Sequence, residues 1–298
     1  FRYDPVEDEW TNRACHGQWN TVAPQGDHFF VGGYTGGFLL EWDPAAPWVA
    51  TDPAASQTNP RFLIQTAPAI NRPHALLAHE NGRDVVLAGG PGYGLTGGGV
   101  LFWDRATETG VLREHTDLIE HHAVMSLVPL EGRRILAGTT VAPGTGGERL
   151  ADLATLVELD LDSKEITWHA PALDGVSEYT DLAVAAGGLI YGIADRSRFF
   201  VFDPVARVIL KEHATEEQFG LTAYHQGPRL FIRDPDSGEM YLLFQKGIAR
   251  ISGGPDYKIE LLSEAPIPIQ CGGDLLNGRI YFGSGSHLYS CNIAGVEA

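Results

Sequence analysis

The chain has few cysteines, few lysines and no long hydrophobic run. Its three cysteines, Cys15, Cys271 and Cys291, lack the Cys-x-x-Cys spacing, and an odd number cannot all pair in disulfides. We interpret them as small apolar residues rather than as a disulfide framework. Only four of the 21 basic residues are lysines, so a basic side chain at a binding site is expected to be an arginine, which suits a carboxylate.

The absence of a long apolar run and of excess positive charge argues against two classes of partner, membranes and nucleic acids. The most apolar stretch, residues 182–194, is too short to span a membrane. Thirty-eight acidic residues against 21 basic ones give a net charge of -17, which disfavours a phosphate backbone. We therefore expect a soluble acidic protein that binds no nucleic acid. Residue 1 is Phe and no signal peptide is present, so the compartment is unknown, and a secreted or periplasmic location with the signal outside this chain stays open.

A short phrase recurs through the whole chain. It is an apolar or aromatic strand that ends in Asp, often followed by Pro, with a mean spacing of about 48 residues, which matches one β-propeller blade. Asp is expected to cap the turn with its carboxylate, while Pro ends the strand. The clear copies end at Asp4, Asp43, Asp104, Asp160 and Asp203, and degenerate copies surround Ser252 and Asn292.

Each full repeat also contains an earlier hairpin, such as "ALLAHENGRDVVLAGG", and a weaker outer strand after the Asp. Four antiparallel strands per repeat predict an all-β propeller that occupies residues 1–298 as a single domain. Helical periodicity occurs only at residues 147–161, where at most one turn is expected. A β-sandwich would not produce the regular spacing.

The number of blades follows from how the repeats begin. Because "FRYDP" resembles a third strand, we favour seven blades, with the inner half of the first blade missing from this chain. The alternative is a six-bladed ring that the N-terminal strand closes.

The loops that enter the inner strands and the loops that join second to third strands are expected on one face, which we call the top face. His74, His122, Tyr179 and Arg229 there offer groups for acid–base chemistry, although a structural role is as plausible for either His. His121 should point away from His122 by strand alternation. The entry loop before Arg229 is "YHQGPR", residues 224–229. Side chains suited to stacking or hydrogen bonding add substrate-binding candidates, namely Gln18, Trp19, Tyr34, Tyr93, Asp181, Arg196 and Gln270.

Several other site types are disfavoured. Long Gly-rich loops such as "GGPGYGLTGGGV" indicate a binding surface, but neither a phosphate-binding loop signature nor a following helix is present. No Gly-x-Ser-x-Gly motif occurs, and no local spacing of Cys, His or Asp supports a metal site. We expect no metal and no cofactor, although a structural metal in the channel stays open.

The repeated strand ends and stretches such as "LIYGIADRSRFFVFDP" resemble bacterial β-propellers with Kelch-like or quinoprotein-like repeats over the whole chain. That resemblance implies the fold, and it implies a range of activities that includes sugar-binding lectins, polysaccharide lyases and hydrolases, and non-catalytic modules. The repeat motif of quinoprotein dehydrogenases is not evident, which argues against pyrroloquinoline quinone.

Two functions and a third alternative remain open. The first is a carbohydrate-active propeller, either a glycoside hydrolase or, most concretely, a lyase for uronic-acid polysaccharides. In the lyase, Arg229 or Arg196 would neutralise the carboxylate, His74 or His122 would act as base and Tyr179 as acid. The second is a glycan- or peptide-binding module that stacks its ligand on aromatic side chains. The third is a protein-interaction scaffold. The sequence does not decide whether the protein is an enzyme, and it leaves the oligomeric state unknown.

Overall fold

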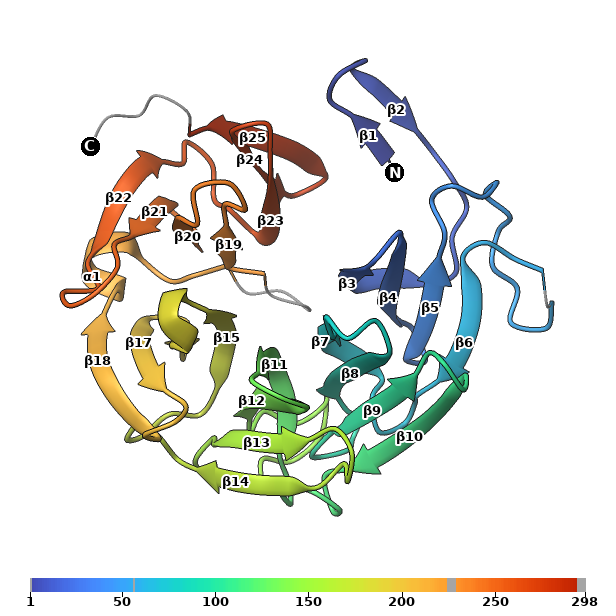
Figure 1. The fold of residues 1–298 in the computed structure, drawn as a ribbon, viewed down its shortest axis with the longest axis horizontal. Helices are drawn as coiled ribbons and strands as arrows, with labels where there is room; N and C mark the ends of the chain where they lie inside the picture. Colours follow the sequence, from blue (N-terminus) through green and yellow to red (C-terminus); the bar gives the residue numbers. More distant parts are fainter. Residues whose placement is uncertain (1, 56, 224–228, 294–298) are drawn as a thin grey trace.

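A computed structural model describes residues 2–55, 57–223 and 229–293. It is a β-propeller in which six blades are arranged around a central axis (Figure 1). Each blade is an antiparallel sheet whose strands follow one another in sequence from the axis outward. The all-β propeller with four-stranded antiparallel blades is therefore confirmed, in the six-bladed form that the sequence offered as the alternative.

The first three blades occupy residues 18–170. The first contains β3 (Gln18–Gln25), β4 (His28–Tyr34), β5 (Phe38–Trp42) and β6 (Arg61–Gln65). The second contains β7 (Arg72–Ala78), β8 (Asp84–Gly90), β9 (Gly99–Asp104) and β10 (Thr109–Glu114). The third contains β11 (Ala123–Leu130), β12 (Arg134–Thr140), β13 (Leu156–Asp160) and β14 (Ile166–Ala170).

The last three blades occupy residues 179–292. The fourth contains β15 (Tyr179–Val184), β16 (Ile190–Ala194), β17 (Arg198–Asp203) and β18 (Val208–Ala214). The fifth contains β19 (Phe231–Arg233), β20 (Met240–Phe244), β21 (Gly247–Ile251) and β22 (Ile259–Glu264). The sixth has three strands, β23 (Cys271–Leu276), β24 (Arg279–Ser284) and β25 (His287–Asn292).

The N-terminal segment forms a separate hairpin, which explains the ambiguity in the blade count. Strands β1 (Arg2–Asp4) and β2 (Glu9–Thr11) pair with each other as a two-stranded sheet. The hairpin stands at the outer side of the ring, between the sixth and the first blade (Figure 1). The preferred count of seven is thus corrected to six, because β1 belongs to no blade. Strand β1 also does not pair with β25 to close the last blade.

The repeated Asp residues cap turns as the sequence predicts. The carboxylate of Asp203 accepts hydrogen bonds from the backbone N–H groups of Val205 (2.8 Å) and Ala206 (2.9 Å). The carboxylate of Asp104 accepts equivalent hydrogen bonds from the backbone N–H groups of Ala106 (2.9 Å) and Thr107 (3.3 Å). Each such turn sends the chain from a third strand into the outer strand of its blade, so the repeat and the strand order have the same physical origin.

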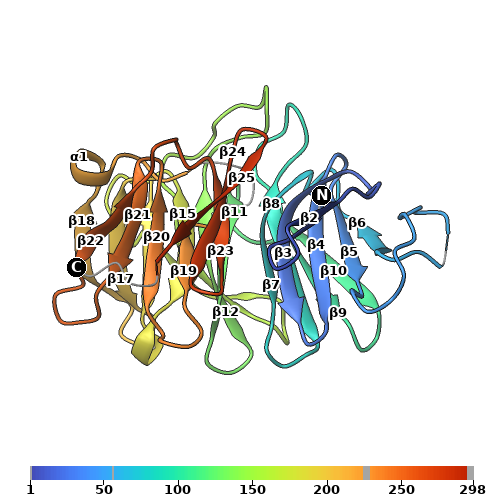
Figure 2. The same cartoon turned by 90° about the horizontal axis from the view of Figure 1, so that it is seen from above.

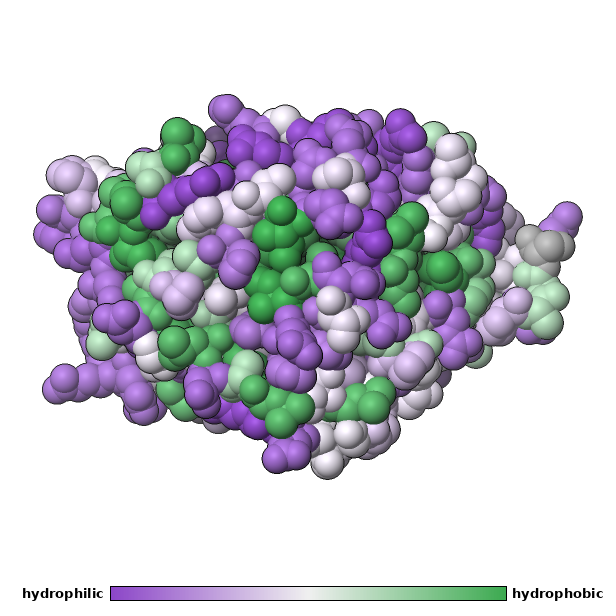
Figure 3. Space-filling view, turned by 90° about the horizontal axis from the view of Figure 1, so that it is seen from below, coloured by the Kyte–Doolittle hydropathy of each residue, from purple (hydrophilic) through white to green (hydrophobic). Residues whose placement is uncertain are grey.

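The core lies between the blades. Third strands such as β9 and β17 are almost wholly buried, whereas the outer strand β18 is mostly exposed. Along the edge formed by the outer strands of the second to fourth blades, apolar residues are interspersed with hydrophilic ones (Figure 3).

The described residues contain two short helical segments, η1 (Ala186–Gly188) and α1 (Glu216–Phe219). Residues 147–155 are loop and lead into β13, which agrees with the prediction of at most one helical turn there.

Candidate functional site

The top face carries two long loops that bind each other. Residues 91–98 join β8 to β9, and residues 141–155 join β12 to β13. The backbone N–H of Gly94 donates to the carbonyl of Thr145 at 3.0 Å, and that of Gly144 donates to Leu95 at 3.0 Å. Both loops project beyond the strands at the same end of the propeller (Figure 2). The Gly-rich sequences therefore form one ordered platform across two blades.

Two glycines are required where these loops touch. A Cβ atom at Gly147 would overlap the carbonyl oxygen of Leu95, and one at Gly144 would overlap that of Gly92. Glycine is thus present for close backbone approach rather than to cradle a phosphate. The sequence showed the loops but gave no signal that they pair.

Next to this platform, two tyrosines and an arginine form a cluster that we call the rim cluster, made of Tyr34, Arg72 and Tyr93. The hydroxyl groups of Tyr34 and Tyr93 are hydrogen-bonded to each other. The guanidinium carbon of Arg72 lies 5.4 Å from the ring centre of Tyr34 and 5.1 Å from that of Tyr93. The hydrogen bond between the two hydroxyl groups raises the pKa of Tyr34 and lowers the pKa of Tyr93. Arg72 lowers the pKa of Tyr93 further.

Arg72 differs from most arginines of the chain in its partners. Among the described residues no carboxylate forms an ion pair with it, whereas Arg61, Arg105 and Arg133 each pair with acidic side chains. Its pKa is raised, first of all by hydrogen bonding to Tyr93. The sequence reasoning did not select Arg72. The available signal was its position in the entry loop that also contains His74.

His74 lies just below Arg72 because the inner strands contain β-bulges. The pairing of β7 with β8 shifts between Pro73 and Ala75, which leaves His74 as the extra residue. Equivalent shifts occur near the top of β3, β11 and β15. Burial lowers the pKa of His74 to about 4, and the nearby positive charge of Arg72 also lowers it. The imidazole is therefore neutral at pH 7. Its Nδ1 atom is buried and has no hydrogen-bond partner among the described residues.

Asp181 faces the same channel from β15. One carboxylate oxygen accepts the backbone N–H of Leu230 at 2.7 Å and that of Phe231 at 3.4 Å, which ties the fourth blade to the fifth. Burial raises the pKa of Asp181 to about 7 although these bonds act in the opposite direction. Asp181 therefore titrates near neutral pH and has a clear structural task.

A cavity of about 180 Å³ in the central channel is lined by both His74 and Asp181. It is smaller than the ~300–1,000 Å³ typical of pockets for drug-sized ligands, so it suits a small polar group. The ion pair between Arg229 and Asp274 (3.4 Å) stands at its side. Residues 224–228, the rest of the predicted entry loop, lie outside the described residues. The cavity is lined in part by His74, Ser126, Asp181 and Arg229.

Tyr179 does not reach this cavity. Its side chain is fully buried between blades, where the ring packs edge-on against Phe200 and the hydroxyl accepts a hydrogen bond from the backbone N–H of Leu173 at 3.1 Å. It precedes the bulge in β15, so strand alternation directs it into the sheet packing. This geometry gives the predicted acid no contact with a ligand in the channel.

His122 is held between two backbone carbonyls. Its Nδ1 atom lies 2.8 Å from the carbonyl oxygen of Glu120 and its Nε2 atom 2.9 Å from that of Leu153. It therefore links its own entry loop to the loop before β13. His121 lies elsewhere, with its backbone N–H bonded to the ring of His115 and with a left-handed backbone. The structure thus separates His122 from His74 and favours a structural role for His122.

The remaining candidates do not share one cavity. Gln18 is exposed at the start of β3, directly opposite Tyr34 in the pairing with β4. Arg196 donates to the carbonyl of Thr222 at 2.8 Å, and the side-chain oxygen of Gln270 accepts the N–H of Gly285 at 2.6 Å. Trp19 packs near Trp48 with ring centres 6.0 Å apart. Of the substrate-binding candidates, the structure brings together Gln18, Tyr34 and Tyr93, while Asp181 joins His74 and Arg229.

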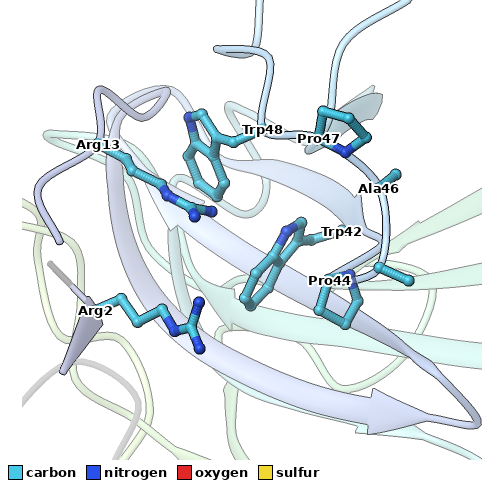
Figure 4. Close-up of a pocket in the computed structure, with 8 residues that line it drawn as sticks. Arg2, Arg13, Trp42, Pro44, Ala46, Pro47 and Trp48 are labelled. Carbon is cyan, nitrogen blue, oxygen red and sulfur yellow. The ribbon is translucent and has the colours of Figure 1, made fainter. Parts of the chain in front are cut away.

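A larger cavity, of about 470 Å³, lies on the open side of the first blade. Trp42 and Trp48 face Arg2 and Arg13 across it (Figure 4). Arg13 stacks on Trp48 at 5.2 Å. This cavity contains none of the predicted catalytic residues and is separate from the channel.

The described residues contain no group of three or more His, Cys, Asp or Glu side chains arranged to hold a metal ion. In the same part of the chain, no helix has the length and apolar character needed to cross a membrane. The expectation that no cofactor is needed stays a prediction.

Solved structures resemble this chain in fold. The extracellular domain of the putative one component system BT4673 from B. thetaiotaomicron matches 94% of this chain with a TM-score of 0.62 and 12% identity. The match covers 35% of that chain, so the present chain spans about a third of it. The β-propeller domain of Myceliophteria thermophila Cps50 (Swd1) matches with a TM-score of 0.62 and 15% identity, over 96% of this chain and 87% of that one.

These identities support the fold alone. No family profile and no curated protein matches the sequence. The Kelch-like or quinoprotein-like type of repeat therefore stays a prediction. The sheet topology gives a β-propeller of six blades, and the comparisons support the propeller fold.

Proposed function

We propose that this propeller is a binding module for an acidic saccharide, which it takes on the top face with its carboxylate on Arg72. The observation that carries the proposal is the rim cluster, where two tyrosine rings hold a guanidinium that has no carboxylate partner among the described residues. Tyrosine rings stack on the apolar faces of sugars, and a guanidinium fork matches a carboxylate. The position of the cluster beside the channel leaves a small polar cavity for a second group of the same ligand.

The charge of the chain gives this site its selectivity. A net charge of -17 repels polyanions in general, so an acidic ligand must find a local positive site. Arg72 can supply that site, because it lies between two tyrosine rings and no ion pair among the described residues neutralises it, unlike Arg61 and Arg133. We expect binding of short acidic oligosaccharides rather than of long, densely charged polymers.

Calorimetric titration with a trigalacturonate, and with the same trisaccharide after its carboxylates are reduced to alcohols, tests the proposal. The acidic ligand should bind, and the neutral one should bind at least about tenfold more weakly, because a hydrogen bond to a charged group contributes roughly 1.5–3 kcal/mol. Arg72→Gln should remove the difference between the two ligands.

Arg149→Gln is the matched control. Arg149 lies in the neighbouring top-face loop, but its guanidinium donates to the backbone carbonyls of Ala151 and Asp152. This variant should keep the preference for the acidic ligand. Equal affinity of the unmodified protein for both ligands, or an unchanged preference in Arg72→Gln, would overturn the proposal.

A lyase for uronic-acid polysaccharides is the second candidate, favoured by one observation. Neutral His74 and cationic Arg229 line the same cavity, as proton abstraction beside a neutralised carboxylate requires. A pKa of about 4 makes His74 a weak base, and Tyr179 is buried, so we rank this function second. Unsaturated uronates absorb ultraviolet light. A rise in absorbance with the unmodified protein that His74→Gln abolishes would establish the lyase, and its absence would reject it.

A further inference from the structure

The hairpin β1–β2 repeats the outer half of a blade. The carboxylate of Asp4 accepts the backbone N–H groups of Val6 (3.1 Å) and Glu7 (3.4 Å). Asp104 and Asp203 make the same pattern of bonds between the third and fourth strands of complete blades. By position and by turn chemistry, β1 corresponds to a third strand and β2 to a fourth.

The inner edge of β1 has no partner strand among the described residues. In each of the five four-stranded blades the third strand pairs on that side with a second strand, as β9 does with β8. Strand β1 pairs with β2 alone. An unpaired edge offers a row of backbone donors and acceptors to another strand.

The sixth blade leaves an apolar side chain exposed on the face opposite to its contact with the fifth blade. Leu288 of its third strand pairs with Gly283 and is 43% exposed, whereas Phe199 and Phe200 of the equivalent β17 are 0% exposed. The strands β23–β25 and the hairpin lie on the same side of the molecule (Figure 2). Buried third strands are the rule in this propeller, so the sixth blade lacks the neighbour that would cover it.

The first blade presents a matching surface from the other side. Its cavity of about 470 Å³ reaches from Trp42 and Trp48 to Arg2 on β1 (Figure 4). Trp42 and Trp48 thus offer aromatic contacts to a strand beside β1.

We propose that the opening between the sixth and the first blade receives a β-hairpin that the described residues do not include, whose second strand pairs with the inner edge of β1. The hairpin would have alternating apolar side chains, because Leu288 on one side and Trp42 and Trp48 on the other offer apolar and aromatic contacts. Two strands would complete a blade, since β1 and β2 already correspond to the third and fourth. A second copy of this chain has no such hairpin to give, because every inner hairpin of its described residues already lies in a blade.

A synthetic peptide with the sequence of residues 72–90, the inner hairpin of the second blade, serves as the probe. It carries the strand pattern and the Asn-Gly-containing turn that this propeller uses. The full chain is titrated with labelled peptide, and hydrogen exchange of residues 2–4 is measured at saturation. The proposal predicts saturable binding and slowed exchange in β1, while a peptide of scrambled sequence should do neither.

Leu288→Arg and Leu210→Arg form the matched pair of variants. Both leucines are similarly exposed, at 43% and 47%, but Leu210 lies on the outer strand β18, away from the opening. Leu288→Arg should weaken peptide binding at least about tenfold, and Leu210→Arg should leave it unchanged. No binding up to about 1 mM peptide, or binding without protection of β1, would overturn the proposal. Dimerisation of the chain alone that protects β1 would overturn it in favour of a second copy.

Discussion

The hydroxyl groups of Tyr34 and Tyr93 meet on the top face although 59 positions separate the two residues in sequence. Tyr34 ends the second strand of the first blade, and Tyr93 belongs to a loop of the second blade. Their contact encloses the guanidinium of Arg72, which comes from the start of β7. Three separate segments thus build one site, and its chemistry depends on the way the blades pack.

The first prediction concerns the ionisation of Tyr93. Its pKa is lowered chiefly by the hydrogen bond with Tyr34, so Tyr34→Phe should raise the pKa of Tyr93 towards its usual value. A pH titration of tyrosinate absorbance, compared with the same titration of Tyr93→Phe, identifies the signal. A Tyr93 pKa that does not move in Tyr34→Phe would contradict the hydrogen bond.

The second prediction concerns the paired loops. Gly147→Ala places a Cβ against the carbonyl of Leu95 and should destabilise the protein by about 1–3 kcal/mol. It should also weaken ligand binding at the rim cluster, because the platform next to it shifts. Thermal unfolding and calorimetry measure both effects. Gly253→Ala is the control, since a Cβ there meets nothing within 4 Å, and equal losses in the two variants would disprove the specific role.

The third prediction uses the titration of Asp181. Because its folded pKa is about 7, the folded state binds this proton more tightly than the unfolded chain. The stabilising contribution is therefore complete below the unfolded pKa of about 4 and is lost as the pH rises through 7. Asp181→Asn cannot titrate, so its stability relative to the unmodified protein should improve between pH 4 and 7, by up to about 4 kcal/mol. Denaturant unfolding at several pH values measures this difference, and two parallel stability curves would refute it.

The fourth prediction concerns the turn caps. Asp203→Ala removes the acceptor of two backbone bonds and should lower the free energy of unfolding by about 1 kcal/mol or more. Asp203→Asn retains a side-chain oxygen and should cost clearly less. Chemical denaturation of both variants tests the assignment, which fails if Ala and Asn are equally tolerated.

The sequence predicts the propeller because each blade repeats the same local pattern of residues. Strand, Asp cap and outer strand recur at Asp104, Asp160 and Asp203, and local turn chemistry is readable without tertiary information. The number of blades was harder to predict from the sequence. "FRYDP" has the local chemistry of a third strand, and only the sheet pairing shows that no blade contains it.

The candidate site was harder to predict, for a geometric reason. The sequence predicts Tyr179 and His74 together on the top face, but a β-bulge shifts the side-chain alternation by one residue, so Tyr179 is buried between blades whereas His74 faces the channel. The contact of Tyr34 with Tyr93 depends on two loops whose pairing has no signature in the sequence. The position of Arg72 in the entry loop of His74 was visible in the sequence, but its place between two tyrosine rings is a property of the fold.

A crystal structure of the full chain soaked with trigalacturonate tests the central claim most directly. We expect a sugar ring against Tyr34 or Tyr93, with its carboxylate in hydrogen-bond contact with the guanidinium of Arg72. A trisaccharide bound only in the tryptophan-lined cavity of the first blade, or none bound at a concentration that saturates the calorimetric titration, would contradict it.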